Sequence, residues 1–333
     1  MDTTESNPTP SKADYFKVDE KSLSQFDFPV EFRDVYVDLR NGDQGLLFPG
    51  SMIKQEKHLA VVDVDRKYTF AIVSPDYEIV SNLQAVELAE KCFQTVFKLT
   101  DTSQMKLFNV IMPKSRSQCH IDFLHSQSRF HIEDGDPWAP FIRVSNSFNR
   151  SRALKFDLGF CRGICHNGLI FGKESIEFKF SHTRGVSVLA LAEFKLKGGE
   201  FSRLETQFKG RLENLQRYHV SPKLMWPLLC KVFALSPPSE DASSRTKLNW
   251  EEQKSAVAKL TEKYFEELEP TGYAALNVLT DYATRPPAVS FGGGRIHGLQ
   301  TTSGLWVEEF VSAISSKDFD FKKYLGDYCS LAT

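Results

Sequence analysis

The sequence lacks the features that would place a protein in a membrane or mark it for export. No apolar run approaches the roughly 20 residues that span a bilayer, and residues 1–12 are polar and hold no hydrophobic signal segment. Six cysteines are scattered without the duplicated pairs of a structural zinc site. We therefore expect a cytoplasmic protein with reduced thiols and without a membrane partner.

The chain also lacks several motifs of nucleotide-binding and thiol enzymes. The glycine run 292–294 before Arg295 is not a phosphate-binding P-loop, because no Lys-Ser or Lys-Thr pair follows it. Cys165 and His166 are neighbours, and neighbouring residues of a strand point to opposite faces, so they cannot pair with each other. Cys161 and Cys165 form a single pair that is more typical of buried thiols than of a metal site. We predict no cofactor and no metal.

Charge is distributed unevenly along the chain, although its net value is only −2. Residues 142–231 hold 16 Lys and Arg against 7 Asp and Glu, so the remainder is acidic. Such a division can mark a surface for nucleic acid or another anion. The alternative is that amphipathic helices in this stretch carry solvated cations.

The pattern of apolar residues predicts an α+β protein with a β-rich antiparallel body and an α-helical C-terminal part. Residues 1–24 are interpreted as a flexible tail and residues 25–235 as the body, which includes a helix capped by Asn82. Residues 236–248, rich in Ser and Pro, are interpreted as a linker. Residues 249–333 form the predicted helical region.

Residues 143–172, which we call the basic ribbon, are the most informative part of the body. Five Lys and Arg lie among its apolar positions, and Asp157 is its only acid. If residues 153–159 form a strand, Lys155 and Asp157 share one face. The aromatic residues of the ribbon then fall on the other face and belong to the core, which leaves the cations free for an exposed surface.

We therefore predict that this region binds nucleic acid without catalysis, with single strands favoured. Neutralisation of phosphates by Lys and Arg dominates nucleic-acid affinity, and aromatic stacking adds to the binding of single strands. The predicted phosphate contacts are Arg150, Arg152, Lys155, Arg162, Lys173 and Arg184. The residues predicted to support the turns are Asn146, Asn149, Asn167 and His182.

Two other classes of function stay open. A metal-dependent nuclease would bring carboxylates together on Mg²⁺, and the candidates for that site are Asp63, Asp65, Glu133 and Asp136. The run from Glu133 to Asp136 is also typical of an ordinary exposed turn. The third class is an interaction protein or homo-oligomer whose basic face meets an acidic partner.

Four patches of sequence resemble an uncharacterised family, the domain of unknown function numbered 932. They are Phe70–Asn82, Glu133–Asp136 with Val144–Ser147, Phe160–Gly168 with Ser181–Thr183, and Gly272–Tyr282. Their order and spacing carry the resemblance, which spans most of residues 58–315. It implies a cytoplasmic protein of phages, plasmids or other mobile elements, with a role in replication, recombination or counter-defence, and it supplies no settled activity.

The chain departs from the family pattern at one turn. Relatives often carry Asp-Gly after the Asn-Ser pair, where this sequence has Phe148, Asn149 and Arg150. Whatever this turn contacts, its chemistry in this chain is expected to differ from that of the relatives.

Overall fold

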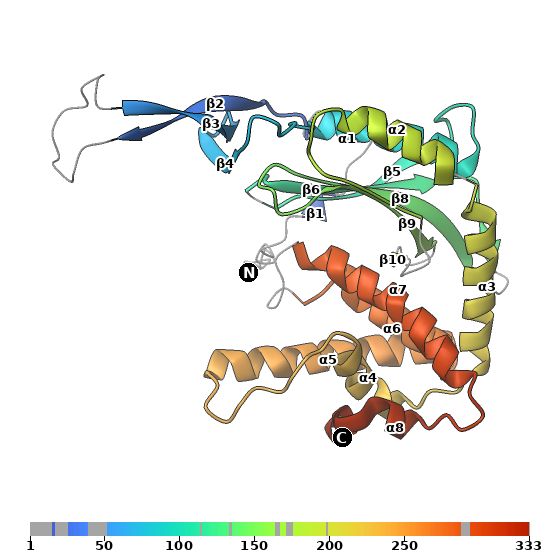
Figure 1. Cartoon of the computed structure of the whole chain (residues 1–333). Helices are drawn as coiled ribbons and strands as arrows, with labels where there is room; N and C mark the ends of the chain where they lie inside the picture. The colour runs from blue at the N-terminus through green and yellow to red at the C-terminus, as the bar shows by residue number, and fades with distance from the viewer. Residues whose placement is uncertain are drawn as a thin grey trace, which may run out of the picture.

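The chain folds as an α+β protein with antiparallel sheets and a helical C-terminal part, which confirms the predicted fold class (Figure 1). The computed structural model describes residues 15–16, 26–38, 52–113, 115–132, 135–163, 167–170, 176–197, 199–287 and 294–332.

The larger sheet, sheet A, forms the centre of the molecule. Its order is β1-β5-β6-β8-β9-β10, with β7 beside β8 and β11 beside β9. Its strands are β1 (Tyr15–Phe16), β5 (Met105–Ile111), β6 (Gln118–His125), β7 (Phe130–His131), β8 (Pro137–Ser147), β9 (Leu154–Arg162), β10 (Gly168–Ile170) and β11 (Glu177–Phe180). The pairs β6–β8 and β8–β9 are antiparallel and join Asp122, Arg143 and Asp157 side by side.

Helices cover both faces of sheet A. They are α1 (Asn82–Phe97), α2 (Val186–Lys197), α3 (Phe201–Arg217), η3 (Pro222–Leu224), α4 (Met225–Val232), α5 (Ser244–Glu267), α6 (Gly272–Thr284), α7 (Gly294–Ile314), α8 (Phe321–Leu325) and η4 (Gly326–Leu331). In Figure 1, α1 and α2 lie on one face and α7 on the other, while α3 runs along the side toward the remaining helices. Among the described residues, no helix combines the length and the hydropathy that a membrane crossing requires.

The two faces of sheet A differ in polarity because side chains alternate along each strand. On β8, Ile142 and Val144 join the main hydrophobic core on the side of α1, and Asn146 of the same face donates a hydrogen bond to Asn82 of α1. Arg143 and Ser145 point to the opposite face, toward α7. The strands are therefore buried on both sides, but one of their faces carries charge.

The smaller sheet, sheet B, projects from the body as an arm (Figure 1). It consists of β2 (Val30–Asp38), β3 (Met52–Asp63) and β4 (Tyr68–Val73) in that order. Strand β4 pairs with β3 only at residues 59–63, so the outer part has two strands. We call this outer part, residues 36–38 and 52–54, the arm tip.

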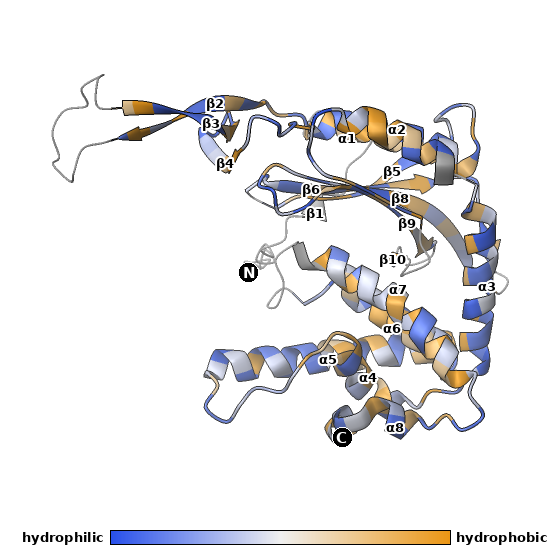
Figure 2. Ribbon diagram, in the orientation of Figure 1, coloured by the Kyte–Doolittle hydropathy of each residue, from blue (hydrophilic) through white to orange (hydrophobic). Residues whose placement is uncertain are grey.

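The hydrophobic core is continuous between the predicted body and the predicted helical region. It includes Phe93 of α1, Phe160 of β9, Leu212 of α3 and Leu276 of α6. Figure 2 shows apolar residues along the strands of sheet A and on the helices that cover it. The boundary predicted from composition therefore separates two stretches of sequence that share one core.

Two predicted helix starts were wrong. Ser81, not Asn82, caps α1, because its hydroxyl accepts the amide of Gln84 while the Gln84 side chain accepts the amide of Ser81. Helix α5 begins at Ser244, within the predicted linker, because the Ser243 hydroxyl accepts the amide of Thr246. The connection between α4 and α5 is accordingly shorter than residues 236–248.

Arg162, at the end of β9, connects the sheet to the helices. Its guanidinium is 1% exposed and bonds Asp136 at 2.6 Å and Glu267 of α5 at 2.8 Å. Tyr273 of α6 donates to the same Asp136 and accepts from the indole nitrogen of Trp138 at 2.7 Å. These bonds tie one end of sheet A to α5 and α6.

We predict that Arg162→Met lowers the free energy of unfolding by roughly 3–5 kcal/mol, because it leaves Asp136 buried without its cation. Urea unfolding followed by tryptophan fluorescence measures the change. The matched control is Arg203→Met, which breaks the exposed Arg203–Glu200 pair of α3 and should cost less than about 1 kcal/mol. Equal effects of the two changes would contradict the buried role of Arg162.

Candidate functional site

A row of charged residues crosses the face of sheet A that looks toward α7. Arg143 bonds both carboxylate oxygens of Asp122, at 2.5 and 2.7 Å, and is fully buried. Asp157, opposite Arg143 in the neighbouring strand, bonds Lys155 at 2.8 Å, and Lys155 also bonds Glu177 at 3.1 Å. Buried charges are rare unless they are paired or functional, so this face is the strongest candidate for a site.

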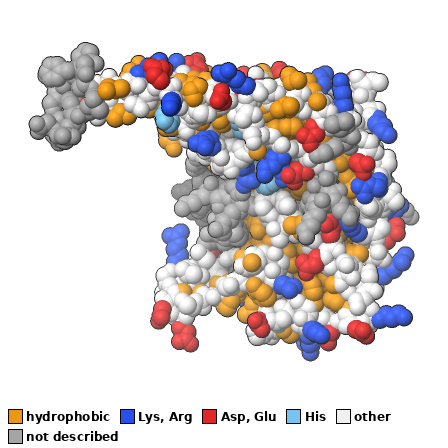
Figure 3. All heavy atoms as spheres, viewed as in Figure 1, with side chains coloured by type: hydrophobic (Ala, Val, Ile, Leu, Met, Phe, Trp, Pro, Cys, Tyr) orange, Lys and Arg blue, Asp and Glu red, His pale blue; other side chains and the backbone are white. Residues whose placement is uncertain are grey.

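A hollow of about 290 Å³, which we call the inner hollow, opens over one end of this row. Its lining residues are Ser145, Ser151, Arg152, Ala153, Lys155, Glu177, Lys179 and His297. Three of them are cations and one is an acid, so the lining has a positive balance. Figure 3 shows Lys and Arg atoms beside a histidine at the waist between the sheet layer and the helical layer.

Two stacked histidines lie at the inner end of the hollow. His120 of β6 and His297 of α7 stack with ring centroids 5.1 Å apart, and both are more than nine-tenths buried. The Nδ1 atom of His120 lies 2.7 Å from the Ser145 hydroxyl. Burial first, and then the charge of Arg143, hold the pKa of both rings below their usual value, so both are neutral at physiological pH.

Burial also changes the ionisation of the central carboxyl group. It raises the pKa of Asp157 from 3.8 to about 6, although the bonded Lys155 acts in the opposite direction. The charge balance of the row therefore changes in mildly acidic solution.

A second hollow of about 370 Å³, the outer hollow, lies toward sheet B. Its lining residues are Lys57, His58, Ile72, Val73, Ser74, Asp76, Tyr77, Arg150, His182 and Thr183. Tyr77 stacks on His182 with centroids 5.2 Å apart, and burial raises the pKa of Tyr77 to about 12. The turn from Asn149 to Arg152 separates the two hollows, because Arg150 lines the outer hollow and Arg152 the inner one.

Arg150 occupies an unusual backbone conformation in this turn. Its φ is 60°, in the left-handed region where glycine is preferred. Its guanidinium donates to the carbonyl of Ile72 at 3.3 Å, and the Asn149 side chain accepts the amide of Ser151 at 3.1 Å. The predicted role of Asn149 in shaping this turn fits that bond.

The predicted cations are divided among three places. Arg150 lines the outer hollow and Arg184 lies beside it, with one guanidinium nitrogen 3.5 Å from the Pro75 carbonyl. Arg152 and Lys155 line the inner hollow, where Arg152 also donates to Gln118 at 3.2 Å. Lys173 lies outside the described residues. Arg162 belongs to neither hollow.

The prediction that Arg162 contacts phosphate was wrong. Arg162 is buried and neutralised by Asp136 and Glu267. Lys155 and Arg162 are seven positions apart on β9, and residues an odd number of positions apart face opposite sides of a strand. A count of positive charge along the ribbon could not separate them.

The remaining polar residues predicted to support turns hold segments together. Asn146 lies within β8, not in a turn, and donates to the Val80 carbonyl at 2.8 Å. Asn167 donates to Tyr264 of α5 and accepts from Arg285, which fixes the start of β10 to the helices. His182 is buried in the wall of the outer hollow.

The carboxylates predicted for a nuclease do not converge. Arg116 bonds both oxygens of Asp63, and Asp65 lies 3.7 Å from the same arginine. Arg116 and its two aspartates lie near the C-terminal end of β8, because the carbonyl of the neighbouring Ser117 accepts the amide of Phe148. Asp136 instead lies directly before the first residue of β8. At ~3.3 Å per residue the strand of 11 residues separates the two groups by roughly 30 Å.

Glu133 lies outside the described residues. Asp63 and Asp136 lie too far apart to hold one metal ion, which the nuclease interpretation requires. Across the described ranges, no three His, Cys, Asp or Glu side chains gather as metal ligands. Cys161 is buried, while Cys165, His166 and residues 292–293 lie outside the described residues.

Sequence reasoning missed most residues that line the two hollows, among them Ser145, Lys179, His297 and Lys57. The sequence does carry a signal for Ser145 and Lys179, namely polar residues at every second position of a strand. Polar residues two apart, at Arg143 and Ser145 and again at Glu177 and Lys179, interrupt strands that are otherwise apolar. This spacing indicates one polar face. His297 and Lys57 come from other elements and carry no such signal.

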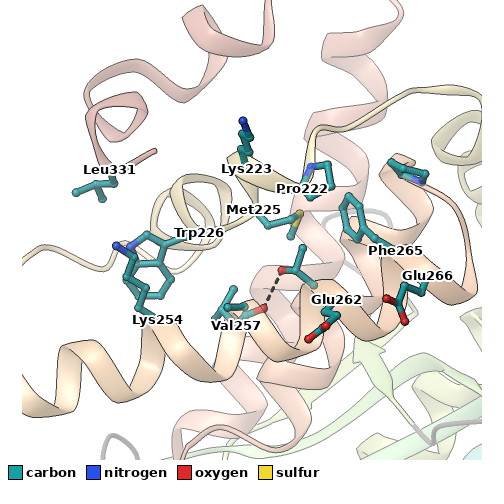
Figure 4. Close-up of a pocket in the computed structure, with 13 residues that line it drawn as sticks. Pro222, Lys223, Met225, Trp226, Lys254, Val257, Glu262, Phe265, Glu266 and Leu331 are labelled. Carbon is teal, nitrogen blue, oxygen red and sulfur yellow. Dashed lines mark hydrogen bonds between the residues drawn. The ribbon is translucent and has the colours of Figure 1, made fainter. Parts of the chain in front are cut away.

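A third hollow lies among the C-terminal helices and differs in character. It has a volume of about 520 Å³ and lies between η3, α4 and α5 (Figure 4). Met225, Trp226 and Phe265 give it an apolar floor, and Lys254 and Glu262 are among the charged residues at its edge. Since its charges are of both signs, it does not extend the cationic surface.

Comparison with known proteins gives one match. The family model described as Domain of unknown function (DUF932) matches residues 69–289, about two-thirds of the chain, and this confirms the predicted resemblance. No curated protein and no solved structure matches the chain.

We predict that Asp157→Asn removes one component of the pH dependence of stability. The folded protein holds the Asp157 proton with a pKa of about 6, against about 3.9 in the unfolded chain. Ionisation therefore costs stability, and the wild-type protein should lose roughly 2–3 kcal/mol relative to the variant as pH rises from about 4 to above 6.

Urea unfolding of both proteins between pH 4.5 and 8 measures this difference. The control is Asp241→Asn, which makes the same substitution at an exposed position before α5. A pH-independent difference for Asp157→Asn would show that its carboxyl group ionises normally.

Proposed function

This chain belongs to the family described as Domain of unknown function (DUF932), and we propose that it binds nucleic acid, with single strands preferred. The phosphates of the strand lie along the two hollows on either side of the turn from Asn149 to Arg152. The observation that carries the proposal is the meeting of cations from separate parts of the chain at that turn: Lys57 from β3, Arg150 and Arg152 from the turn, and Lys155 from β9.

Electrostatics supports this proposal. Cations that neutralise phosphates release counterions, which gives most of the sequence-independent affinity for nucleic acid. The chain as a whole is slightly acidic, so an anion is attracted by local charge and not by net charge. The turn concentrates this charge where two polar hollows meet.

The outer hollow also supports a preference for single strands. The stacked rings of Tyr77 and His182 lie in its wall, beside the guanidinium of Arg150. Aromatic surface next to cations is the usual combination in proteins that hold unpaired bases, where stacking contributes about 1–3 kcal/mol per base. A duplex would keep its bases out of a hollow of this size.

The role in replication, recombination or counter-defence on a mobile element rests on the family resemblance. Together with the cytoplasmic location, it stays a prediction.

We predict that Arg150→Glu with Arg152→Glu lowers the affinity for a single-stranded oligonucleotide at least roughly tenfold at low salt. Two lost phosphate contacts should also reduce the slope of log K against log salt by about one to two units. Fluorescence anisotropy at several salt concentrations measures both quantities.

The matched control changes the net charge equally at a distant place. Arg245→Glu with Lys259→Glu alters two exposed positions of α5 and should leave affinity and slope close to wild type. If wild-type protein binds no DNA or RNA at low salt, or if both double variants lose affinity equally, the proposed surface is wrong.

A second candidate function, self-association, is favoured by the arm tip. Tyr36, Val37, Met52 and Ile53 are each at least 40% exposed there, and a two-stranded hairpin is marginally stable by itself in water. Val37 and Ile53 are cross-strand partners. The same chain exposes Val188, Leu189 and Leu191 on α2, with Val188 at 72%, and a second copy could offer these side chains to the tip.

We predict that Val37→Asp with Ile53→Asp reduces the mass of the particle in solution to that of one chain, because charge on the arm tip opposes apolar contact. Sedimentation equilibrium measures the mass. The control Leu248→Asp places a charge on exposed α5 and should leave the mass unchanged. A wild-type protein that is already monomeric at micromolar concentration would remove this second candidate.

A further inference from the structure

We infer that the inner hollow binds a phosphate monoester, the group found at a phosphorylated end of a nucleic-acid strand. This inference rests on the proposed binding of nucleic acid and adds a preference for strand ends. The observation behind it is a small polar hollow in which three cations lie beside buried polar atoms that have no hydrogen-bond partner among the described residues.

The first argument is the set of unpartnered polar atoms behind the hollow. Nε2 of His120, Nδ1 of His297 and Nη1 of Arg143 are buried and have no hydrogen-bond partner among the described residues. Buried polar groups are nearly always satisfied, and each exception calls for an explanation such as an absent ligand. His297 lines the hollow directly and stacks on His120, so the two histidine nitrogens belong to one place, and Arg143 shares the strand face of Ser145, which also lines the hollow.

The second argument is charge. Arg152, Lys155 and Lys179 line the hollow against one acid, Glu177. A phosphodiester of the strand backbone carries one negative charge, whereas a monoester carries about −1.5 to −2 at pH 7. The Arg143–Asp122 pair is neutral, and Asp157 offsets part of Lys155. Three cations against Glu177 and Asp157 leave a balance of about +1, which attracts either kind of phosphate group, so the preference for a monoester rests on the size of the hollow and on the donors of its wall.

The third argument is size and shape. A volume of about 290 Å³ lies at the lower end of the range for small-molecule sites, so it holds about one terminal nucleotide and not a longer stretch of chain. The strands of sheet A form its floor, with Ser145 of β8 buried in it. A strand can insert its end there more readily than it can pass through.

The fourth argument is the chemical character of the lining. Its described residues are Ser, Arg, Ala, Lys, Glu and His, so the wall has many donors and little flat aromatic surface. Donors of this kind recognise phosphate oxygens and provide little stacking for a base. The stacking surface lies instead in the outer hollow, across the turn.

Three labelled single-stranded oligonucleotides of one sequence test the inference by fluorescence anisotropy: one with a 5′-phosphate, one with a 3′-phosphate and one with hydroxyl groups at both ends. We expect one phosphorylated end to bind about tenfold more tightly than the unphosphorylated strand, since hydrogen bonds to a charged group are stronger than those to a neutral one. The comparison of the two phosphorylated strands identifies which end enters.

Variants locate the preference in the inner hollow. Lys179→Gln removes a cation at its exposed rim, and His297→Phe keeps the ring but removes its nitrogens; both should lower the ratio of affinities toward one. The matched control Lys195→Gln, on the exposed side of α2, should keep the wild-type ratio.

Equal affinity for all three strands overturns the inference and leaves nucleic-acid binding intact. A preference that persists in both Lys179→Gln and His297→Phe also overturns it. If no strand binds but a nucleoside 5′-monophosphate does, and the nucleoside does not, the monoester site stands and the proposed function falls. If none of these ligands binds, both fall.

Discussion

The structure depends on how sheet A accommodates charge on a face that is covered by protein. Arg143 lies at the centre of that face, bonded to Asp122 on one side and opposite Asp157 on the other. A buried arginine without a carboxylate costs several kcal/mol, so Asp122 is needed for β6 and β8 to pair in this register. A one-residue shift of β8 would turn Arg143 toward the apolar core beneath α1 and away from Asp122. The row therefore fixes the register as well as the site.

The same row determines which cations remain for a ligand. Lys155 is shared between Asp157 and Glu177, and Arg143 is neutralised, so the interior contributes little net charge. The positive balance arises at the surface end of the row, around the turn that carries Arg150 and Arg152. The ion pairs behind the inner hollow hold its polar floor in place. Arg150 and Arg152, at the openings of the two hollows, make the surface positively charged.

Part of this arrangement could be predicted from the sequence. Alternation on β9 predicted that Lys155 and Asp157 share a face while Phe156 joins the core, and both are confirmed. The same alternation puts Arg162 and Lys155 on opposite faces of β9, whereas the count of positive charge along the ribbon grouped Arg162 with the phosphate contacts. The partners of each charge lie far away in the sequence: Asp136 is 26 residues from Arg162, and Glu267 is 105 residues away. Local patterns carry no information about such pairs, nor about which residue of α7 meets His120.

The conformation of the turn between the hollows supports the proposal that its cations contact a ligand. Arg150 adopts a conformation that favours glycine, and a non-glycine residue there carries strain. The strain is offset in part by the bond from its guanidinium to Ile72, but glycine at this position would satisfy the backbone at lower cost. Five other non-glycine residues of the described chain share a positive φ, so strain alone does not identify a site. Arg150, however, is both a strained residue and a cation that lines the outer hollow. Arg152, two positions later, lines the inner hollow. A turn optimised for stability alone would not need arginine there, whereas a turn that holds phosphates on both of its sides would.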